Sequence, residues 1–516
     1  MWWMHPVLGD PTTLALGNPR SEALIHLWGL WTTTEGLWEH GPYMKVSATG
    51  WPHGFREHLM DPLSLLVFAP AAALGGAVLG WNLLHAVALI VGIVGCILLA
   101  RELDGDPMVL VVGFCASAFM LSVVDHGRTE MLGGLGLPLH LALLHRSLRT
   151  RSWRLALLAG VVLGLVANSG PYVAVFSLLL VVPLALIWDR SPLLLVVALP
   201  ALALALPPIV VLAMNPVEAM APTLEYGGGV WDFVAQYRVP TEATRSTDLE
   251  QCAYIGLVGL GLCLIGGRRT WPWAALAVAL TLLSPGPTLD FGPVEFAGPA
   301  ALLDKTALHG IQHWNRLGVV LALPVAIGAS IAARRWRWAP SLAAPLLIAD
   351  QATWPRLAPS ATAWDPSPPS ELEWVDERLP PGALVHLPLD LFGGDHVQLR
   401  GEYLMWALFH GRPVSARDHA VGDALYDQAL LRLAIELQRG LTDRLTEEDV
   451  HAARQSAEWM RTQGAAALVF HADRPDARRV RPLLDQAFGP PPRERDPLYA
   501  WPLPELGLEP LDPVAP

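Results

Sequence analysis

The first candidate for chemistry in this sequence is a carboxylate next to an imidazole. Glu22 and His26 are four residues apart, in a stretch with helical spacing. Residues with this spacing lie on the same side of an α-helix. A carboxylate beside an imidazole can act as a general base, because each group changes the proton affinity of the other. The alternative interpretation is a polar helix face that is only solvated.

A second group of ionisable residues, Asp125-His126-Gly127-Arg128-Thr129-Glu130, connects two apolar runs. Charged groups so close to an apolar boundary are costly unless they face a cavity or a partner. Arg128 could hold a phosphate, and Glu130 could hold a metal ion or a sugar hydroxyl. The alternative is an Arg128–Glu130 ion pair that only ties the loop together.

A third group, from His309 to Arg316, lies immediately before an apolar run. Arg316 is placed to bind a lipid phosphate or diphosphate, which the planar guanidinium contacts with two hydrogen bonds. His309 and His313 share a helix face, as two metal ligands would, although the metalloprotease signature is absent. The alternative for Arg316 is contact with ordinary lipid headgroups.

Aromatic residues flank three successive glycines in the segment from Glu225 to Asp232. Tyr226 and Trp231 offer flat faces to a sugar ring, and the glycines give a flexible hinge. The segment is either a lid over a site or an ordinary flexible loop.

The elements that must position these groups are predominantly membrane helices. The sequence is 53% hydrophobic and only 16% charged. Residues 61–350 contain apolar runs of about 16–23 residues, enough to cross about 30 Å of hydrocarbon. We predict a mainly α polytopic membrane helix bundle of about ten spans. The predicted spans are 79–101, 107–124, 131–147, 153–168, 171–188, 191–213, 251–266, 270–285, 318–333 and 338–350.

Arginines in short loops set the orientation of this bundle, because they gather on the cytoplasmic side. The predicted order of spans places the loops around Arg149, Arg190, Arg268 and Arg335 on one side of the membrane. The opposite side, outside, then receives 1–60, 214–250, 286–317 and the C-terminal end. With an even number of spans the N-terminus is outside as well. We therefore predict that a first span upstream is missing from the sequence; the alternative is a short tail that crosses the membrane.

Two amphipathic or apolar segments precede the first predicted span. Residues 22–38 form a helix with Leu27, Trp28 and other apolar side chains on one stripe, which suits the membrane interface. Residues 63–78 are predicted to form a second interfacial or re-entrant helix. Asp61 is its predicted N-cap, and a cap that points into a cavity can also contact a substrate.

The C-terminal part has the composition of a soluble domain. Residues 351–380 are predicted to be a linker rich in Pro, Ser and Ala. Residues 381–516 are predicted to be a small α/β domain outside the membrane, with strands at 382–390, 464–471 and 499–503. Helices are expected across 423–462, with a cap at Thr446. No nucleophile arrangement or metal-ligand spacing stands out, so a binding or lid role is expected.

The net charge of −12 argues against nucleic acid as a partner. A protein that follows a phosphate backbone needs a basic face.

Several short motifs resemble those of the GT-C superfamily of membrane glycosyltransferases, and more narrowly the bacterial mannosyltransferase-like or family 39-like proteins. The layout of spans, outer loops and a C-terminal soluble domain is similar as well. The motifs are Gly9-Asp10-Pro11, Asn18-Pro19-Arg20-Ser21-Glu22, His26-Leu27-Trp28, Asp61-Pro62-Leu63, Asn82-Leu83-Leu84 and Gly127-Arg128-Thr129-Glu130.

The resemblance implies transfer of a sugar from a polyprenyl-phosphate donor on the outer face of the bacterial inner membrane. In that superfamily an acidic residue of the first outer loop activates the acceptor. The carboxylates at the matching place are Glu22 and Asp10, with His26 in support. The residue is usually Asp, so Glu22 is a departure. The acceptor would be a glycan, a lipid or a protein, and a divalent metal ion (Mg²⁺ or Mn²⁺) is a possible cofactor.

Two other classes of function remain open from the sequence. A transporter or flippase of lipid-linked substrates would need ionisable residues within the spans, and these are scarce. An inactive GT-C-like protein that serves as a scaffold for envelope assembly is compatible with Glu in place of Asp.

Overall fold

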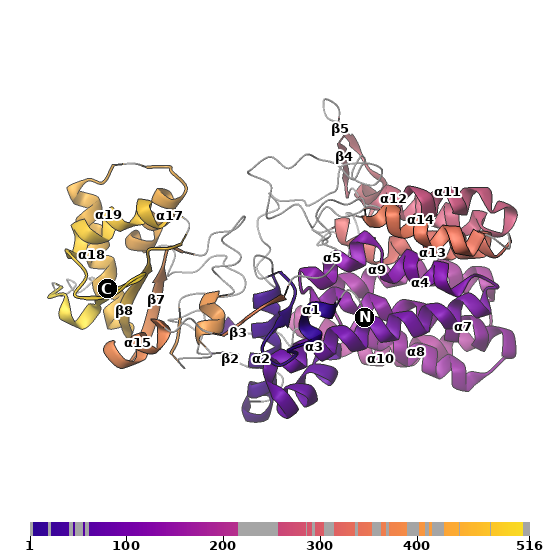
Figure 1. Cartoon of the computed structure of the whole chain (residues 1–516), viewed down its shortest axis with the longest axis horizontal. Coiled ribbons are helices and arrows are strands. Elements are labelled where there is room, and N and C mark those ends of the chain that lie inside the picture. The colour runs from indigo at the N-terminus through magenta and orange to yellow at the C-terminus, as the bar shows by residue number, and fades with distance from the viewer. Residues whose placement is uncertain are drawn as a thin grey trace. The chain divides into compact units, whose positions relative to one another are not determined.

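The computed structural model describes most of the chain, and the remaining residues are drawn as a thin trace (Figure 1). The described residues are 4–18, 22–40, 45–46, 55–56, 61–214, 256–284, 286–290, 295–303, 314–335, 339–352, 363–367, 371–389, 402–407, 412–414, 428–442, 444–474 and 476–508.

The chain folds into two compact units. One contains residues 1–18 and 59–365, and the other contains residues 19–58 and 366–516. The N-terminal sixty residues, which the sequence analysis kept together, are therefore divided between the two units.

The first unit is a bundle of apolar helices (Figure 1). Its helices are α1 (His5–Leu8), α3 (Pro62–Glu102), α4 (Pro107–Cys115), α5 (Ala118–Asp125), α6 (Thr129–Leu132), α7 (Leu137–Thr150), α8 (Trp153–Ala167), α9 (Pro171–Trp188), α10 (Leu193–Met214), α11 (Leu257–Ile265), α12 (Trp271–Leu283), α13 (Gly318–Arg334) and α14 (Ala339–Ala352). Helix α8 packs against α7 and α10, and α7 packs against α3. Helix α4 lies between α3 and α13, and α13 in turn packs against α11 and α12.

Short strands and 3-10 turns complete this unit. The strands are β1 (Ala15–Leu16), β4 (Thr288–Asp290), β5 (Glu295–Ala297) and β6 (Ala363–Trp364). The 3-10 turns are η2 (Gly133–Gly136), η6 (Gly267–Arg269), η7 (Pro299–Leu302) and η8 (Trp314–Leu317). Strands β4 and β5 form an antiparallel hairpin, and β1 pairs antiparallel with β6.

One described helix, Leu63–Glu102, is long and apolar enough to cross a membrane, and the bent pair Pro107–Cys115 and Phe119–Asp125 would make a second. The shorter apolar helices among the described residues coincide with six further predicted spans: Trp153–Ala167, Tyr172–Trp188, Leu193–Leu206, Trp271–Leu283, Gly318–Arg334 and Ser341–Asp350. The total of about ten spans, counted from runs long enough for the bilayer, stays a prediction.

Helix α3 differs from the predicted boundary between an interfacial segment and a span. It is broken at Gly75 and Gly76, of which Gly76 has φ 85° and ψ 168°. A side chain is strained at such a φ, so a glycine is required there. The chain thus has two helical segments as predicted, but the break precedes residue 79. The predicted cap is confirmed, because the carboxylate of Asp61 accepts a hydrogen bond from the Ser64 backbone N–H at 3.1 Å.

The predicted span 107–124 is also broken, between α4 and α5. The side chain of Ser117 caps α5 by accepting a hydrogen bond from Met120 N at 3.3 Å. The predicted span 131–147 begins instead with α6 and η2, before α7 starts at Leu137.

The N-terminal segment is tied to α3 through an asparagine. The Asn82 amide donates to the carbonyls of Pro11 and Leu14 at 2.9 and 2.7 Å, and its oxygen accepts from Leu16 N at 2.9 Å. The Trp81 indole donates to Leu16 O at 2.7 Å. Because Leu16 lies in β1, these contacts position β1 on the bundle.

The segment predicted as a linker is partly ordered structure. Strand β6 pairs with β1, with Trp364 opposite Ala15. Helix α15 (Glu371–Arg378) follows, and its Trp374 and Val375 are buried. The prediction of a linker over 351–380 is wrong for these residues, because apolar side chains spaced along a short helix gain free energy by burial.

The second unit begins with α2 (Ala23–His40), close to the predicted helix, and a small hairpin of β2 (Lys45–Val46) and β3 (Phe55–Arg56). Leu27 and Trp28 on α2 are only 0% and 1% exposed. The expectation that this stripe lies in the membrane interface is therefore wrong for these two side chains, which are buried in protein.

The C-terminal part of this unit is an α/β arrangement around a four-stranded sheet in the order β7-β8-β10-β9. The strands are β7 (Ala383–Leu387), β8 (Ala465–His471), β9 (Arg493–Arg495) and β10 (Leu498–Pro502). Strand β7 is parallel to β8, and β10 is antiparallel to β8 and β9. Helices α17 (Ala429–Gln438), α18 (Glu447–Thr462) and α19 (Ala477–Phe488) pack against one another, and the turn η9 (Leu503–Glu505) follows β10.

The core of this part lies between the sheet and these helices. It contains Val385 of β7, Phe470 of β8 and Trp501 of β10, with leucines from the helices. The predicted cap of α18 is confirmed: Thr446 Oγ1 accepts from Asp449 N at 3.1 Å, and Asp449 accepts from Thr446 N at 2.9 Å.

Two buried histidines meet on β7 and β8. His386 Nδ1 and His471 Nε2 are 2.9 Å apart, so one ring donates a hydrogen bond to the other. Both side chains are 1% exposed and lie against the rings of Tyr403 and Trp406. Burial, with the positive charge of Arg474 as a second cause, holds the pKa of His471 well below its usual value of 6.5.

We expect this part of the protein to lose stability in mild acid. The unfolded chain binds a proton at His471 below about pH 6.5 and the folded chain does not, so stability is full above that pH and falls as the pH drops. The slope should approach about 1.4 kcal/mol per pH unit. Urea unfolding at several pH values between 7.5 and 5, monitored by tryptophan fluorescence, measures this dependence of the unfolding free energy on pH. His471→Gln should flatten the slope, whereas His451→Gln, at an exposed position of α18, should leave it unchanged.

Candidate functional site

A mostly buried ion pair joins two loop segments of the helical unit. Arg316 Nη1 donates to Glu130 Oε1 at 3.4 Å, although 186 residues separate them. The two side chains are only 12% and 14% exposed. Glu130 stands in the first turn of α6, and Arg316 lies in η8, immediately before α13. The sequence predicted both residues as substrate-binding, and the structure brings them together.

The arginine is also held by an aromatic ring that the sequence analysis missed. The guanidinium of Arg316 lies over the ring of Tyr172, 5.0 Å from its centre. Tyr172 is in the first turn of α9, directly after Gly170 and Pro171. A Cβ on Gly170 would lie 3.0 Å from Glu130 Cβ, so glycine permits this close approach of α9 to α6. The signal in the sequence was an aromatic residue at the start of a predicted span.

Asp61 is linked electrostatically to the same region. It is buried (5% exposed) and has φ 56°, a conformation that aspartate tolerates better than most residues. Burial raises the pKa of the Asp61 carboxyl to about 7, in spite of opposing hydrogen bonds from Ser64, and the charge of Glu130 raises it further. Thr129, next to Glu130, also hydrogen-bonds to Asp61.

The arrangement gives one cation and two carboxylic groups at one end of the bundle. A guanidinium held by a ring and a carboxylate is preorganised to bind phosphate oxygens. Carboxyl groups with raised pKa values cluster at functional sites. Arg128 is the residue that precedes α6 and is partly buried.

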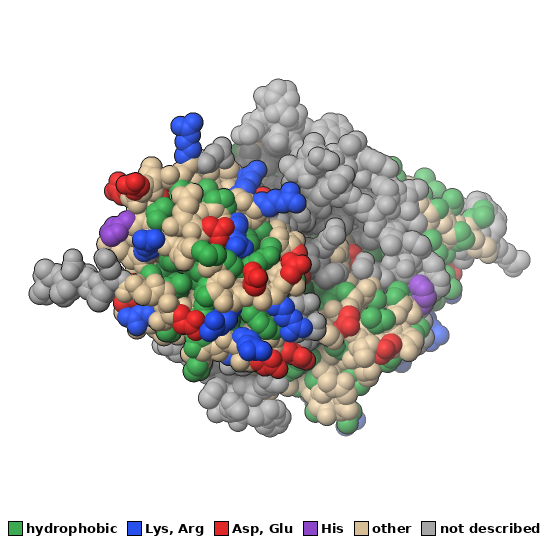
Figure 2. Space-filling view, turned by 60° about the vertical axis from the view of Figure 1, so that its left-hand side comes forward, with side chains coloured by type: hydrophobic (Ala, Val, Ile, Leu, Met, Phe, Trp, Pro, Cys, Tyr) green, Lys and Arg blue, Asp and Glu red, His purple; other side chains and the backbone are tan. Residues whose placement is uncertain are grey.

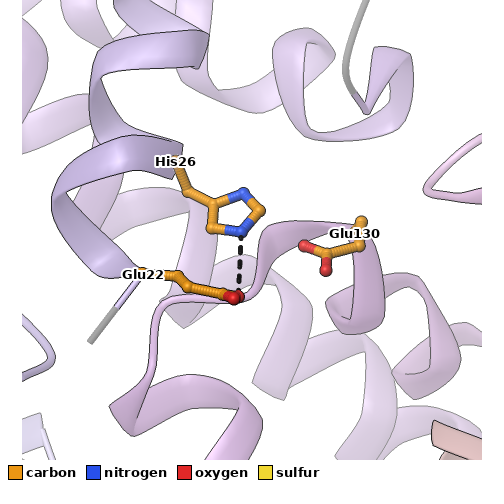
Figure 3. A group of neighbouring side chains, drawn as sticks. All are labelled: Glu22, His26 and Glu130. Atoms are coloured by element: carbon orange, nitrogen blue, oxygen red, sulfur yellow. Dashed lines mark ion pairs between the residues drawn. The ribbon is translucent and has the colours of Figure 1, made fainter. Parts of the chain in front are cut away.

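Glu22 and His26 form the predicted pair within the second unit (Figure 3). Glu22 immediately precedes α2, and its Oε2 lies 3.7 Å from His26 Nε2. The His26 side chain is 8% exposed and that of Glu22 is 30% exposed. The predicted helical spacing is confirmed by the backbone hydrogen bond from His26 N to Glu22 O at 3.0 Å. Glu130, also drawn in Figure 3, belongs to the first unit.

Asp10 lies in an exposed turn of the first unit. Its Oδ1 accepts a hydrogen bond from Thr12 Oγ1 at 3.3 Å, and its carbonyl accepts from Leu14 N at 3.1 Å. Hydrogen bonds from Thr13 and Thr12 lower the pKa of Asp10. These contacts give Asp10 a local role in the turn, and its predicted catalytic role stays a prediction.

Three of the predicted substrate-binding residues lie outside the described residues. They are Tyr226, Trp231 and His313. Their roles stay predictions.

The fold resembles that of solved membrane glycosyltransferases. A mutant form of the arabinofuranosyltransferase AftD from Mycobacteria superposes with a TM-score of 0.50 and 15% identity, over 90% of this chain and 35% of AftD. ArnT from Cupriavidus metallidurans gives a TM-score of 0.49 and 12% identity, over 97% of this chain and 95% of ArnT. The oligosaccharyltransferase AglB from Archaeoglobus fulgidus gives 0.48 and 13% identity, over 89% of this chain and 66% of AglB.

No protein-family model and no curated protein matches the sequence. The chain spans about a third of the length of AftD. At these identities the likeness shows the fold alone. The helical fold that the resemblance implied is therefore shared with a solved membrane glycosyltransferase at the level of the fold.

Proposed function

We propose that the protein is a membrane glycosyltransferase that moves a sugar from a polyprenyl-phosphate donor to a glycan, lipid or protein acceptor. The observation that carries this proposal is the Arg316–Glu130 pair on Tyr172, because a fixed guanidinium at the end of an apolar bundle suits a lipid-linked phosphate. The GT-C-like fold supports it.

In the proposed reaction the acceptor hydroxyl loses its proton to Glu22, which His26 assists. The acceptor oxygen attacks the anomeric carbon, and the bond from that carbon to the phosphate oxygen breaks with inversion. The electron pair of the broken bond leaves on the polyprenyl phosphate. Arg316 stabilises the negative charge that develops there, as preorganised donors do in other transfer reactions.

A divalent cation, Mg²⁺ or Mn²⁺, would supply further positive charge at the leaving phosphate. The carboxylate of Glu130 in the helical unit is a ligand of suitable chemistry for such a cation.

We also propose that the reaction takes place on the outer face of the bacterial inner membrane, with about ten spans and the C-terminal α/β part in the periplasm. The distribution of arginine over the short loops supports this orientation.

The experiment that tests the function is release of the donor lipid. Purified protein in nanodiscs is incubated with radiolabelled polyprenyl-phosphate hexoses and pentoses, and free polyprenyl phosphate is measured with and without EDTA. We expect release that depends on the protein and on an added acceptor extract. Omission of the acceptor should reduce release, which distinguishes transfer from hydrolysis.

The alternatives give different results in the same preparation. A flippase would move the intact donor between leaflets of a vesicle without cleaving it, and a scaffold would do neither. Either result, obtained with the full donor panel, would refute the transferase proposal.

A further inference from the structure

A pocket of about 520 Å³ opens on the C-terminal α/β part, between α19 and the sheet. Its polar lining comes from Arg478, Arg481, Asp485 and Gln486 on α19 and from Tyr499 on β10. Arg478, Arg481 and Asp485 are three and four residues apart, and therefore share a helix face. The volume falls within the range of about 300–1,000 Å³ that is usual for small-molecule sites.

One arginine of the pocket is fixed in position. Arg481 Nε donates to both carboxylate oxygens of Asp485 at 2.9 Å. Its guanidinium also lies over the ring of Tyr499, 4.6 Å from the centre, and within 5.3 Å of the Trp501 ring. A guanidinium held on one edge and one face loses little conformational entropy when it binds a ligand.

The other edge of this guanidinium is available. Within the part of the chain that the structure describes, Arg481 Nη1 and Nη2 have no hydrogen-bond partner, and its side chain is 28% exposed. The Tyr499 hydroxyl and the Gln486 amide also lack a partner among the described residues, although both line the pocket. The pocket thus presents hydrogen-bonding groups that a ligand can satisfy.

The charges of the lining residues favour an anionic ligand. Arg478 and Arg481 outweigh the single carboxylate of Asp485. The face turned forward in Figure 2 carries charged side chains of both signs and no broad basic patch. Planar guanidinium edges match carboxylate and phosphate groups.

The neutral part of the lining suits a sugar. Phe470, Ala472 and Pro482 give apolar contacts, whereas Gln486 and Tyr499 offer groups that bond to hydroxyls. We propose that this pocket binds an acidic sugar residue of the acceptor glycan, through its carboxylate or phosphate group. The assignment to an acceptor rests on the proposed transferase function, whereas binding of an acidic sugar does not.

The test measures binding by the full chain in nanodiscs, without any transfer reaction. The probes are glucuronate, glucose 6-phosphate, glucose and inorganic phosphate, followed by ligand-observed NMR and calorimetry. We expect both acidic sugars to bind more tightly than glucose and than inorganic phosphate. Arg481→Gln should weaken their binding about tenfold or more, the usual effect of losing a charged hydrogen bond.

Three further variants keep the result interpretable. Arg495→Gln removes the same charge from an exposed position on β9 outside the pocket and should bind as the wild type does. Arg478→Gln, also exposed, and Tyr499→Phe, which keeps the ring beneath Arg481, should each weaken binding of acidic sugars. They provide the test if Arg481→Gln does not fold.

Equal affinity for glucose and glucuronate would overturn the proposal, as would wild-type binding by both Arg478→Gln and Tyr499→Phe. Inorganic phosphate that binds as tightly as glucose 6-phosphate would overturn the sugar assignment. Binding of acidic sugars without any sugar transfer would support the pocket proposal and refute the transferase proposal. Sugar transfer without such binding would refute the pocket proposal alone.

Discussion

Replacement of Glu22 by Gln is expected to lower the rate of sugar transfer by about 10²- to 10⁴-fold, the usual contribution of a general base. The amide has the same shape but cannot take the acceptor proton. The main loss should be in kcat, because the acceptor and the donor lipid still bind. Release of radiolabelled polyprenyl phosphate under donor saturation measures it, and the melting temperature reports whether the variant folds.

Asp10→Asn is the matched control for this variant. Asp10 is the other carboxylate that the superfamily resemblance allowed as the base, and it lies in an exposed turn bonded to Thr12. We therefore expect Asp10→Asn to retain most of the activity. Full activity in Glu22→Gln combined with a loss in Asp10→Asn would transfer the role of base to Asp10.

The helices of the bundle could be predicted largely from the sequence because they depend on local apolar runs. Most predicted spans coincide with helices such as α8, α9 and α13. The breaks within the predicted spans were harder to predict, although the sequence carries signals for them. Gly75 and Gly76 interrupt α3, and Ser117 caps α5 inside a continuous apolar run. A count based on hydropathy passes over both, since neither glycine nor serine lowers the mean hydropathy much.

The contacts of the site could be predicted only in part. Glu130 and Arg316 were each recognised from charge beside an apolar boundary, but the sequence suggested Arg128 as a partner for Glu130. Pairing over 186 residues depends on how α6 and η8 pack, which no local pattern encodes. Tyr172 was missed for the same reason, because its role arises from the ring face that it turns to Arg316.

The buried histidine pair of the C-terminal part shows the same limit. His386 and His471 each fall within a correctly predicted strand. Their contact follows from the parallel pairing of β7 with β8, where His386 lies opposite Val469. The pattern of a strand predicts which side chains lie on each face of the sheet, but not which strands are neighbours.

Replacement of Arg316 by Lys is expected to lower transfer by about 10²- to 10³-fold, the usual effect of losing one preorganised donor at a developing charge. Lysine keeps the positive charge beside Glu130, so the fold should persist. It lacks the planar fork that contacts two phosphate oxygens and also stacks on Tyr172. The kinetics of donor cleavage, together with donor affinity, measure the effect.

The role of Arg316 can be separated from stability by comparing two further variants. Arg316→Gln alone removes the cation beside the mostly buried carboxylate of Glu130 and should lower the melting temperature. Arg316→Gln combined with Glu130→Gln removes both charges and should recover much of that stability, as measured by melting temperature. The double variant should nevertheless remain inactive if Arg316 binds the leaving phosphate. Recovery of activity together with stability would show instead that the pair only holds α6 and η8 in place.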